Sequence, residues 1–193
     1  MAFRRGFKTE ANEITVEVRS ELGLSLHDAL DPYALAAWLE IPIVGLSEYV
    51  DEAPAVSHLL KVEPEVFSAV TVFAGSRRTI VHNDAHARVR QVSNLSHELS
   101  HALLHHPPTP ALDNKGCRHW NQDIEDEASW LCGALLVPEP AAMLIARGRW
   151  STHAAAACHF GVSQPMIRYR LNATGAQIRI QRARNARAAR ARG

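Results

Sequence analysis

Two histidines four residues apart, with a glutamate between them, are the residues of this chain best suited to chemistry. Residues 96–101 read SHELSH and contain the pattern H-E-x-x-H. On a helix, residues i and i+4 share a face about one turn apart, so His97 and His101 can bind one Zn²⁺ ion with Glu98 beside its open position. Zinc lowers the pKa of a bound water toward about 7, and a carboxylate there can pass the proton to a leaving amine. The pattern therefore indicates a zinc-dependent hydrolase.

The residues around the motif indicate that this helix is buried. Its apolar positions are Val92, Leu95, Leu99, Ala102 and Leu103. Three ionisable residues on such a helix need a function or a partner, because an unpaired charge is costly to bury. The alternative is an exposed polar face on which histidine and glutamate fall by accident, since the chain contains 11 histidines.

A catalytic zinc ion requires a third protein ligand. His105 is unsuitable, because eight residues advance a helix by about 12 Å from His97. We expect His105 and His106 at the helix C-terminus, interacting with its last carbonyl groups. Cys117 and His119 are candidates from the loop that follows, although nothing nearby holds them in place.

A carboxylate on the next predicted helix, at about residues 121–136, is the stronger candidate. The apolar stripe of this helix consists of Ile124, Ala128, Leu131, Cys132, Leu135 and Leu136. Glu125 borders the stripe beside Cys132, whereas Glu127 lies about 160° from Glu125 around the helix, toward Trp130 and Ala134. We therefore expect Glu125 to be the third ligand and Ser129, one turn later, to orient a ligand histidine. The alternative is that Glu125 only complements the helix dipole.

The remaining elements predict a small sheet between two sets of helices. We expect helices at about 8–22 and 32–40, a strand at 41–46, and either a β-hairpin or two neighbouring edge strands on the two sides of Gly75-Ser76. Helices at 92–106 and 121–136 and three short helical pieces follow. Pro107 and Pro108 end the motif helix. This order indicates an α+β fold, mostly helical with a small β-sheet, followed by a short helical C-terminal piece and a basic tail.

Length and composition favour one ordinary globular domain with an appendage. A chain of 193 residues, 47% of them apolar, can fold without a structural metal, so a bound metal is expected to do chemistry. The three cysteines form no C-x-x-C pair, which argues against a disulfide framework or a cysteine zinc site. Because there is no signal-peptide pattern and no run of 18 apolar residues, we expect a cytoplasmic protein without a membrane segment.

Charge is distributed unevenly along the chain. All 20 acidic residues lie at or before Glu139 with 11 of the basic ones, and the other 10 basic residues follow it. Residues 1–139 thus carry a net charge of −9 and residues 140–193 carry +10. Residues 179–193 contain six arginines and no carboxylate. This tail is either a solubilising, partly helical segment or a weak contact for nucleic acid or an acidic partner.

The two motif helices resemble the ImmA/IrrE family of metallo-endopeptidases. Residues 92–106 (VSNLSHELSHALLHH) and 125–138 (EDEASWLCGALLVP) match its pattern of H-E-x-x-H followed by E-x-E-A-N-x-F-A-x-x-L-L-x-P. The segments ANEITVEVRSELGL, DPYALAAWLEIPIV, TIVHND and HFGVSQPMIRYRLNATG extend the resemblance over about residues 8–175.

The resemblance implies a zincin-like peptidase core and a division of the chain into three parts. We expect the core in residues 1–150, a small helix-turn-helix-like extension in 151–176 and an Arg/Ala-rich tail in 177–193.

Residue by residue, the resemblance implies that His97, His101 and Glu125 are the zinc ligands and that Glu98 is the catalytic base. Ser100 stands where the family has Gly, and Ser129 where it has Asn. Glu127 also belongs to the family pattern and remains the alternative ligand.

The function implied by the resemblance is cleavage of a helix-turn-helix repressor, which relieves repression of a mobile element or a stress operon. An edge strand at Thr79–Asn83 would hold an extended peptide by β-augmentation, unless this strand is sheet interior. His82, His119 and Tyr169 are candidate stabilisers of the oxyanion, unless they are structural or exposed.

The competing hypothesis is a binding protein without proteolytic activity. In this case the chain is an antirepressor or a DNA-associated regulator with a structural or silent zinc site. Residues 160–171 have the turn of a helix-turn-helix and precede the basic tail. The alternative for these residues is a helical hairpin that packs on the peptidase core.

Overall fold

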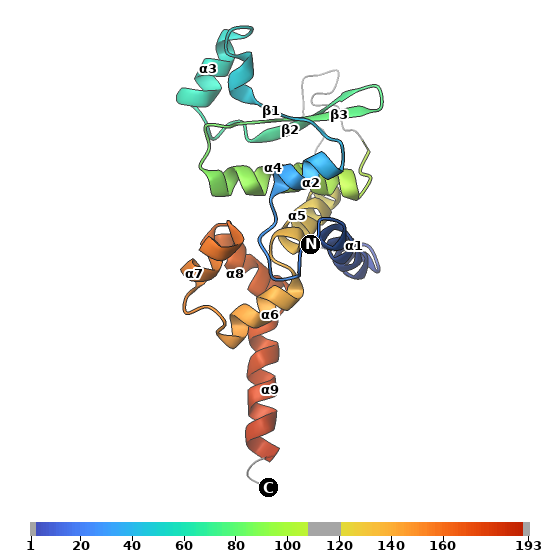
Figure 1. Ribbon diagram of the computed structural model, residues 1–193, viewed down its shortest axis with the longest axis vertical. Coiled ribbons are helices and arrows are strands. Elements are labelled where there is room, and N and C mark those ends of the chain that lie inside the picture. Colours follow the sequence, from blue (N-terminus) through green and yellow to red (C-terminus); the bar gives the residue numbers. More distant parts are fainter. Residues whose placement is uncertain (1–2, 108–120, 191–193) are drawn as a thin grey trace.

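The computed structural model describes residues 3–107 and 121–190. Its elements in chain order are α1 (Phe7–Glu21), α2 (Pro32–Trp38), β1 (Ile43–Gly45), the 3₁₀ helix η1 (Leu46–Tyr49), α3 (Pro54–Lys61), β2 (Ala69–Ala74), β3 (Arg77–His82), α4 (Arg88–Leu103), α5 (Gln122–Leu136), α6 (Glu139–Arg147), α7 (His153–Phe160), α8 (Gln164–Ala173) and α9 (Ala176–Arg190). The sheet lies on one side of α4, and α5 crosses its other side (Figure 1). This arrangement confirms the expected α+β fold.

The sheet has the strand order β1-β3-β2. β3 pairs antiparallel with β2, with Thr71 opposite Ile80, and parallel with β1, with Ile43 opposite Ile80. The expectation of an edge strand at Thr79–Asn83 is therefore wrong, because β1 occupies the second side of β3. Among the described strands, none pairs with the outer side of β2, so β2 is an edge strand of the sheet, and it packs against α4.

Helix α4 separates the sheet from α5 and is buried on both sides. Val92, Leu95 and Leu99 form its apolar stripe, as the periodicity predicts. The helix begins at Arg88, four residues before the expected start, because the chain turns directly from β3 through residues 83–87 into it.

Helix α5 is the centre of the apolar core. Nearly all of its residues from Ala128 to Leu136 are buried. Its outer side packs against α1, where the rings of Phe7 and Trp130 meet edge to face with centroids 5.7 Å apart. Asn121 caps the N-terminus by accepting a hydrogen bond from the backbone N–H of Asp123, as is typical of asparagine at this position.

The helices after α5 form a cluster of their own. α6 packs against α8 and α9, and α7 packs against α8. The cluster joins the core at Gly133, where an added Cβ would lie 2.8 Å from Cε1 of Tyr169, so only glycine allows α8 this close to α5. The division of the chain at residue 150 stays a prediction.

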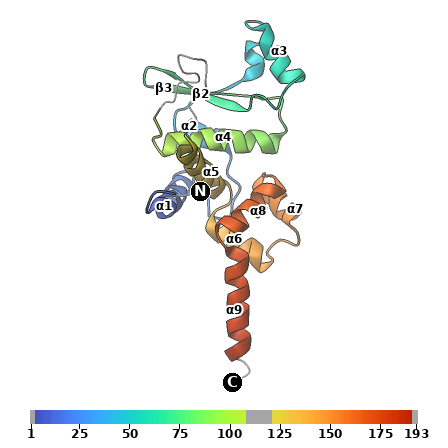
Figure 2. The ribbon, with the colours of Figure 1, turned by 180° about the vertical axis from the view of Figure 1, so that it is seen from behind.

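Helix α9 projects away from the rest of the molecule in both views (Figures 1 and 2). The predicted basic tail is thus a helix as far as Arg190. Two further elements, η1 and α3, lie between the first strand and the hairpin and were not predicted from the sequence.

No single helix in residues 3–107 and 121–190 is long and apolar enough to cross a membrane. α5 and α6 together reach the required length and composition, but they are bent by 59° relative to each other.

Candidate metal centre

Helix α4 places its two motif histidines on the side that faces α5. His97 and His101 are one turn apart, and their ring centroids lie 4.8 Å from each other. Their Nε2 atoms are separated by 3.1 Å. The spacing of four residues therefore places the Nε2 atoms of both rings beside each other, as expected for residues on one face of a helix.

The first turn of α5 adds a carboxylate to this pair. Oε2 of Glu125 lies 3.1 Å from Nε2 of His97 and 3.7 Å from Nε2 of His101. Ligand atoms of these three residues all lie within 4.8 Å of one another. The structure thus brings together the three residues that the sequence analysis selected as metal ligands.

The chemistry of these three donors suits a bound cation. A proton on one Nε2 atom can satisfy only one of the three contacts, because a neutral imidazole has a single N–H group. Atoms about 2.05 Å from a tetrahedrally coordinated zinc ion lie about 3.3 Å apart. The observed separations of 3.1, 3.1 and 3.7 Å scatter around this value.

The electrostatics of the site favour an ionised carboxylate. Interactions with the rings of His101 and His97 lower the pKa of the Glu125 carboxyl to about 2, and they outweigh the opposing effect of partial burial. Glu125 is therefore an anion throughout the neutral range, which is the form that binds metals.

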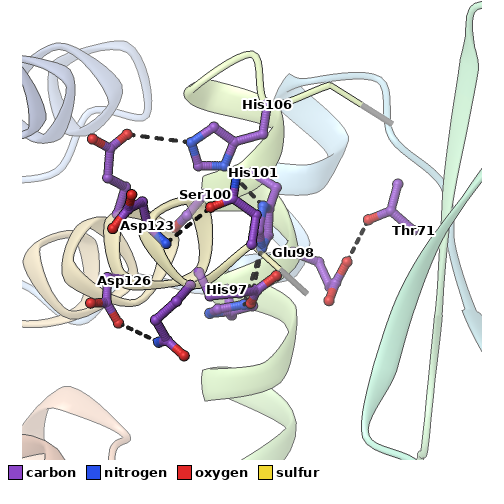
Figure 3. Close-up of polar contacts among 12 residues, drawn as sticks. Thr71, His97, Glu98, Ser100, His101, His106, Asp123 and Asp126 are labelled. Atoms are coloured by element: carbon purple, nitrogen blue, oxygen red, sulfur yellow. Dashed lines mark hydrogen bonds and ion pairs between the residues drawn. The ribbon is translucent and has the colours of Figure 1, made fainter. Parts of the chain in front are cut away.

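Glu98 points from α4 in a different direction, toward the sheet. Its Oε2 accepts a hydrogen bond of 2.6 Å from the hydroxyl of Thr71 on β2 (Figure 3). The carboxylate therefore lies between the histidine pair and the edge strand of the sheet. Sequence reasoning missed Thr71, because its role depends on which strand of the hairpin lies over α4.

Ser100, which stands where the family has glycine, is fully buried without occupying the site. Its hydroxyl donates a hydrogen bond of 2.7 Å to the carbonyl oxygen of Ser96 in the preceding turn. The hydroxyl is satisfied within α4, so this departure from the family pattern leaves the donor cluster unchanged.

Glu127, the alternative ligand, faces another group. Its Oε2 lies 3.6 Å from Nε2 of His106, and its Oε1 lies 3.2 Å from Nε of Arg4. Glu127 does not belong to the cluster of metal-binding donors found in the described residues. The structure thus keeps Glu125 and Glu127 apart, as the helical periodicity predicts.

A further histidine, His106, lies against His101, while the orienting role expected of Ser129 stays a prediction. Nδ1 of His106 lies 2.9 Å from Nδ1 of His101, on the side of the ring that faces away from the donor cluster. Its backbone N–H also bonds the carbonyl oxygen of His101, so only its main chain behaves as expected for a residue at the end of α4.

The candidate oxyanion stabilisers His82 and Tyr169 contact residues outside the donor cluster. His82 lies at the end of β3, where its Nε2 is 3.4 Å from the Tyr33 hydroxyl. Tyr169 packs against Gly133, eight residues along α5 from Glu125, which corresponds to about 12 Å. His119 and the candidate ligand Cys117 lie outside the described residues.

The buried helix, its two histidines and glutamate, and a carboxylate from the following helix define a metallopeptidase-type site. The chain belongs to the family described as the IrrE N-terminal-like domain, a peptidase family whose model matches residues 57–172. This match confirms the resemblance to the ImmA/IrrE family and includes both motif helices and the hairpin. Comparison with curated proteins and with solved structures finds no significant match.

Proposed function

We propose that this protein is a zinc-dependent endopeptidase in which Glu98 is the general base. The observation that carries the proposal is the convergence of His97, His101 and Glu125, whose ligand atoms lie within 4.8 Å of one another. Glu98 follows His97 directly on α4. A bound zinc ion supplies a water of lowered pKa and a Lewis acid for the scissile carbonyl.

The residues of the chain supply the proton transfers. Glu98 accepts the proton of the attacking water and returns it to the leaving amine. The 2.6 Å hydrogen bond from Thr71 holds this carboxylate on the side of the site that faces the sheet. An amide at position 98 can keep the hydrogen bond from Thr71 but cannot accept a proton.

The edge strand β2 supports a peptide as the substrate. No strand in residues 3–107 and 121–190 pairs with its outer side, so an extended peptide could add there as a further strand. Because Thr71 belongs to this strand and contacts Glu98, a peptide on β2 would lie beside the base. We therefore propose that the peptide contact predicted at Thr79–Asn83 is made by Ala69–Ala74 instead.

We infer from the family pattern that the substrate is a helix-turn-helix transcriptional repressor. Its cleavage would relieve repression of a mobile element or a stress response. Such a substrate implies an enzyme that works in the cytoplasm, where a DNA-binding repressor resides.

The test is metal analysis of the purified protein, followed by co-expression with a helix-turn-helix repressor encoded beside its gene. We expect one zinc per chain and two repressor fragments. Glu98→Gln should retain the zinc and lose cleavage by a factor of about 10² to 10⁴, the usual contribution of a general base. A wild-type protein without metal, or full activity in Glu98→Gln, would contradict the proposal.

We further propose that α9 contacts nucleic acid. Among the described residues of α9 are five arginines and no acidic residue. Arg179 pairs with Glu139, while Arg182, Arg184, Arg187 and Arg190 are exposed. These four cover about 200° of a helix about 22 Å long, so several can meet the phosphates of a duplex at once. Binding near an operator would bring the peptidase to its repressor.

The contact with nucleic acid is tested by fluorescence anisotropy of the full chain with a labelled duplex at several salt concentrations. Binding should weaken with salt, and Arg182→Gln combined with Arg187→Gln should reduce the slope by about 0.9 for each lost phosphate contact. The matched control removes the same charge at Arg5 and Arg77, two exposed positions outside the C-terminal helices. Equal effects of both double variants would show that only net charge matters.

A further inference from the structure

The ring of His101 has different neighbours on its two nitrogens. Nε2 faces Nε2 of His97 and Oε2 of Glu125 in the donor cluster. Nδ1 lies 2.9 Å from Nδ1 of His106, whose Nε2 in turn lies 3.6 Å from Oε2 of Glu127. Figure 3 shows His106 directly against His101. A continuous chain of polar contacts therefore leads from the donor cluster to Glu127.

We propose that His106, supported by Glu127, is a positioning residue that fixes the ring orientation and the tautomer of His101 for metal binding. The inference rests on the proposed zinc function and adds two residues to it. Glu127 then supports the site through His106, two contacts behind the ligand His101.

The proton positions along this chain of contacts follow from the chemistry of imidazole. When Nε2 of His101 binds a metal, its single proton resides on Nδ1. This N–H group donates to Nδ1 of His106, which must then be unprotonated. The proton of His106 therefore resides on Nε2, the nitrogen that faces the carboxylate of Glu127. Each nitrogen thus has one role, and the arrangement favours the tautomer of His101 that binds a metal.

The backbone at the end of α4 is shaped to deliver His106 to this place. His105 adopts a left-handed conformation with a φ of 52°. Its N–H bonds the carbonyl oxygen of Ala102 at 3.1 Å, and the N–H of His106 bonds that of His101 at 3.0 Å. These two bonds form a Schellman motif, which reverses the chain over the last helical turn. The ring of His106 consequently meets the ring of His101 at a centroid distance of 5.0 Å.

Glu127 is held in place by two partners. It lies two residues after Glu125 on α5, so the two carboxylates point about 160° apart around the helix. Nε of Arg4, just before α1, contacts both carboxylate oxygens of Glu127, at 3.2 and 3.4 Å. Only 12% of the Glu127 side chain and 9% of the His106 side chain is exposed. This burial keeps water from replacing either partner and gives their contact a defined geometry.

The experiment measures zinc affinity by competition with a chromophoric chelator, together with the visible spectrum of the Co²⁺-loaded protein. Loss of a hydrogen-bond partner behind a metal ligand typically lowers affinity by about 10- to 100-fold, and we expect this for His106→Ala. His106→Gln should restore most of the affinity, since its amide can accept from His101 and donate to Glu127. Glu127→Ala should cost less than His106→Ala.

The matched control is His105→Asn, which removes the neighbouring exposed histidine and tolerates the left-handed backbone. Arg4→Gln controls for the ion pair of Glu127. Urea unfolding of the metal-free variants separates stability from metal binding. The inference is overturned if His106→Ala binds zinc as tightly as His105→Asn, or if His106→Gln loses as much affinity as His106→Ala. Absence of zinc from the wild-type protein would instead refute the proposed function itself.

Discussion

Both ends of α5 meet charged side chains, partly buried at the first turn and fully buried at the other end, and the two ends use them in opposite ways. At the first turn, Glu125 meets His97 and His101, so that three lone-pair donors converge. At the other end, the guanidinium group of Arg19 donates to the carbonyl oxygen of Leu135 at 2.7 Å. The first end brings together lone-pair donors that can share a cation, whereas the second end pairs hydrogen-bond donors with hydrogen-bond acceptors.

The arginine end satisfies its backbone groups internally. Arg19 also donates to the carbonyl oxygens of Ser25 and Asp28, and Arg170 donates to that of Val137. Both cations lie where the negative end of the helix dipole of α5 favours positive charge. Burial lowers the pKa of each guanidinium to about 10, so both remain charged at neutral pH. A buried charge with complementary partners holds a fold together, while a convergence of unshared lone pairs indicates a ligand.

The largest expected effect comes from removing a donor at the first turn of α5. Glu125→Ala should lower zinc affinity well beyond the about 100-fold expected for a supporting residue, because it deletes a ligand. The free energy of unfolding of the metal-free protein should fall by only about 1 kcal/mol, because the variant loses two partly exposed contacts of Glu125 with histidines. Isothermal titration with zinc and urea unfolding in a chelator measure the two quantities.

We expect Glu125→Ala to lower zinc affinity more than Glu127→Ala does. A metal-free Glu127→Ala protein together with normal zinc binding by Glu125→Ala would contradict the assignment of the ligand. Glu127→Gln is a useful control, since it keeps an acceptor near His106 and removes only the charge.

Changes at the arginine end should have the opposite profile. Arg19→Met leaves three carbonyl oxygens without their donor and should lower the free energy of unfolding by about 3 kcal/mol. Arg170→Met leaves one such oxygen and removes a guanidinium that lies over the Trp130 ring but whose Nη atoms have no hydrogen-bond partner in the described residues. We therefore expect a loss of about 1 kcal/mol or less for it. Zinc affinity should remain unchanged in both.

The two variants are compared by urea unfolding in the presence of a chelator, with Arg5→Met as an exposed control. Equal losses for Arg19→Met and Arg170→Met would contradict the importance of the extra carbonyl contacts. A loss of zinc affinity in either variant would show that the two ends of α5 are coupled.

The local parts of the fold were predictable from the sequence. The positions of His97, His101 and Glu125 follow from the helical repeat and the apolar stripes of two helices, which are properties of short segments. The order of the strands was not predictable in the same way, because the parallel pairing of β1 with β3 joins residues that are distant in sequence. For the same reason the hydrogen bond from Thr71 to Glu98 could not be inferred.

The roles of His106 and of the buried arginines were missed for two different physical reasons. A non-glycine residue in the left-handed conformation is uncommon, so His105 gave little sign of a Schellman turn. Pro107 and Pro108 indicate that the helix ends before them, but not the conformation in which it ends. Arginine is usually exposed, and the burial of Arg19 depends on carbonyl groups at the end of α5, 116 residues away in the chain.

The smallest expected effect concerns the part of α5 that lies between Glu125 and Leu135. Cys132 is buried there, its Sγ lies 3.6 Å from the carbonyl oxygen of Ser93, and burial raises the pKa of its thiol to about 12. Because the thiolate is the reactive form, iodoacetamide at about pH 8 should label exposed Cys158 readily and Cys132 only after unfolding. Mass spectrometry of a Cys117→Ser variant measures both rates. If the arginine end and the apolar core hold α5 in place, removal of zinc with a chelator should leave the labelling rate of Cys132 nearly unchanged. Labelling of Cys132 at the rate of Cys158 after removal of zinc would show that the metal, rather than the core, holds this helix.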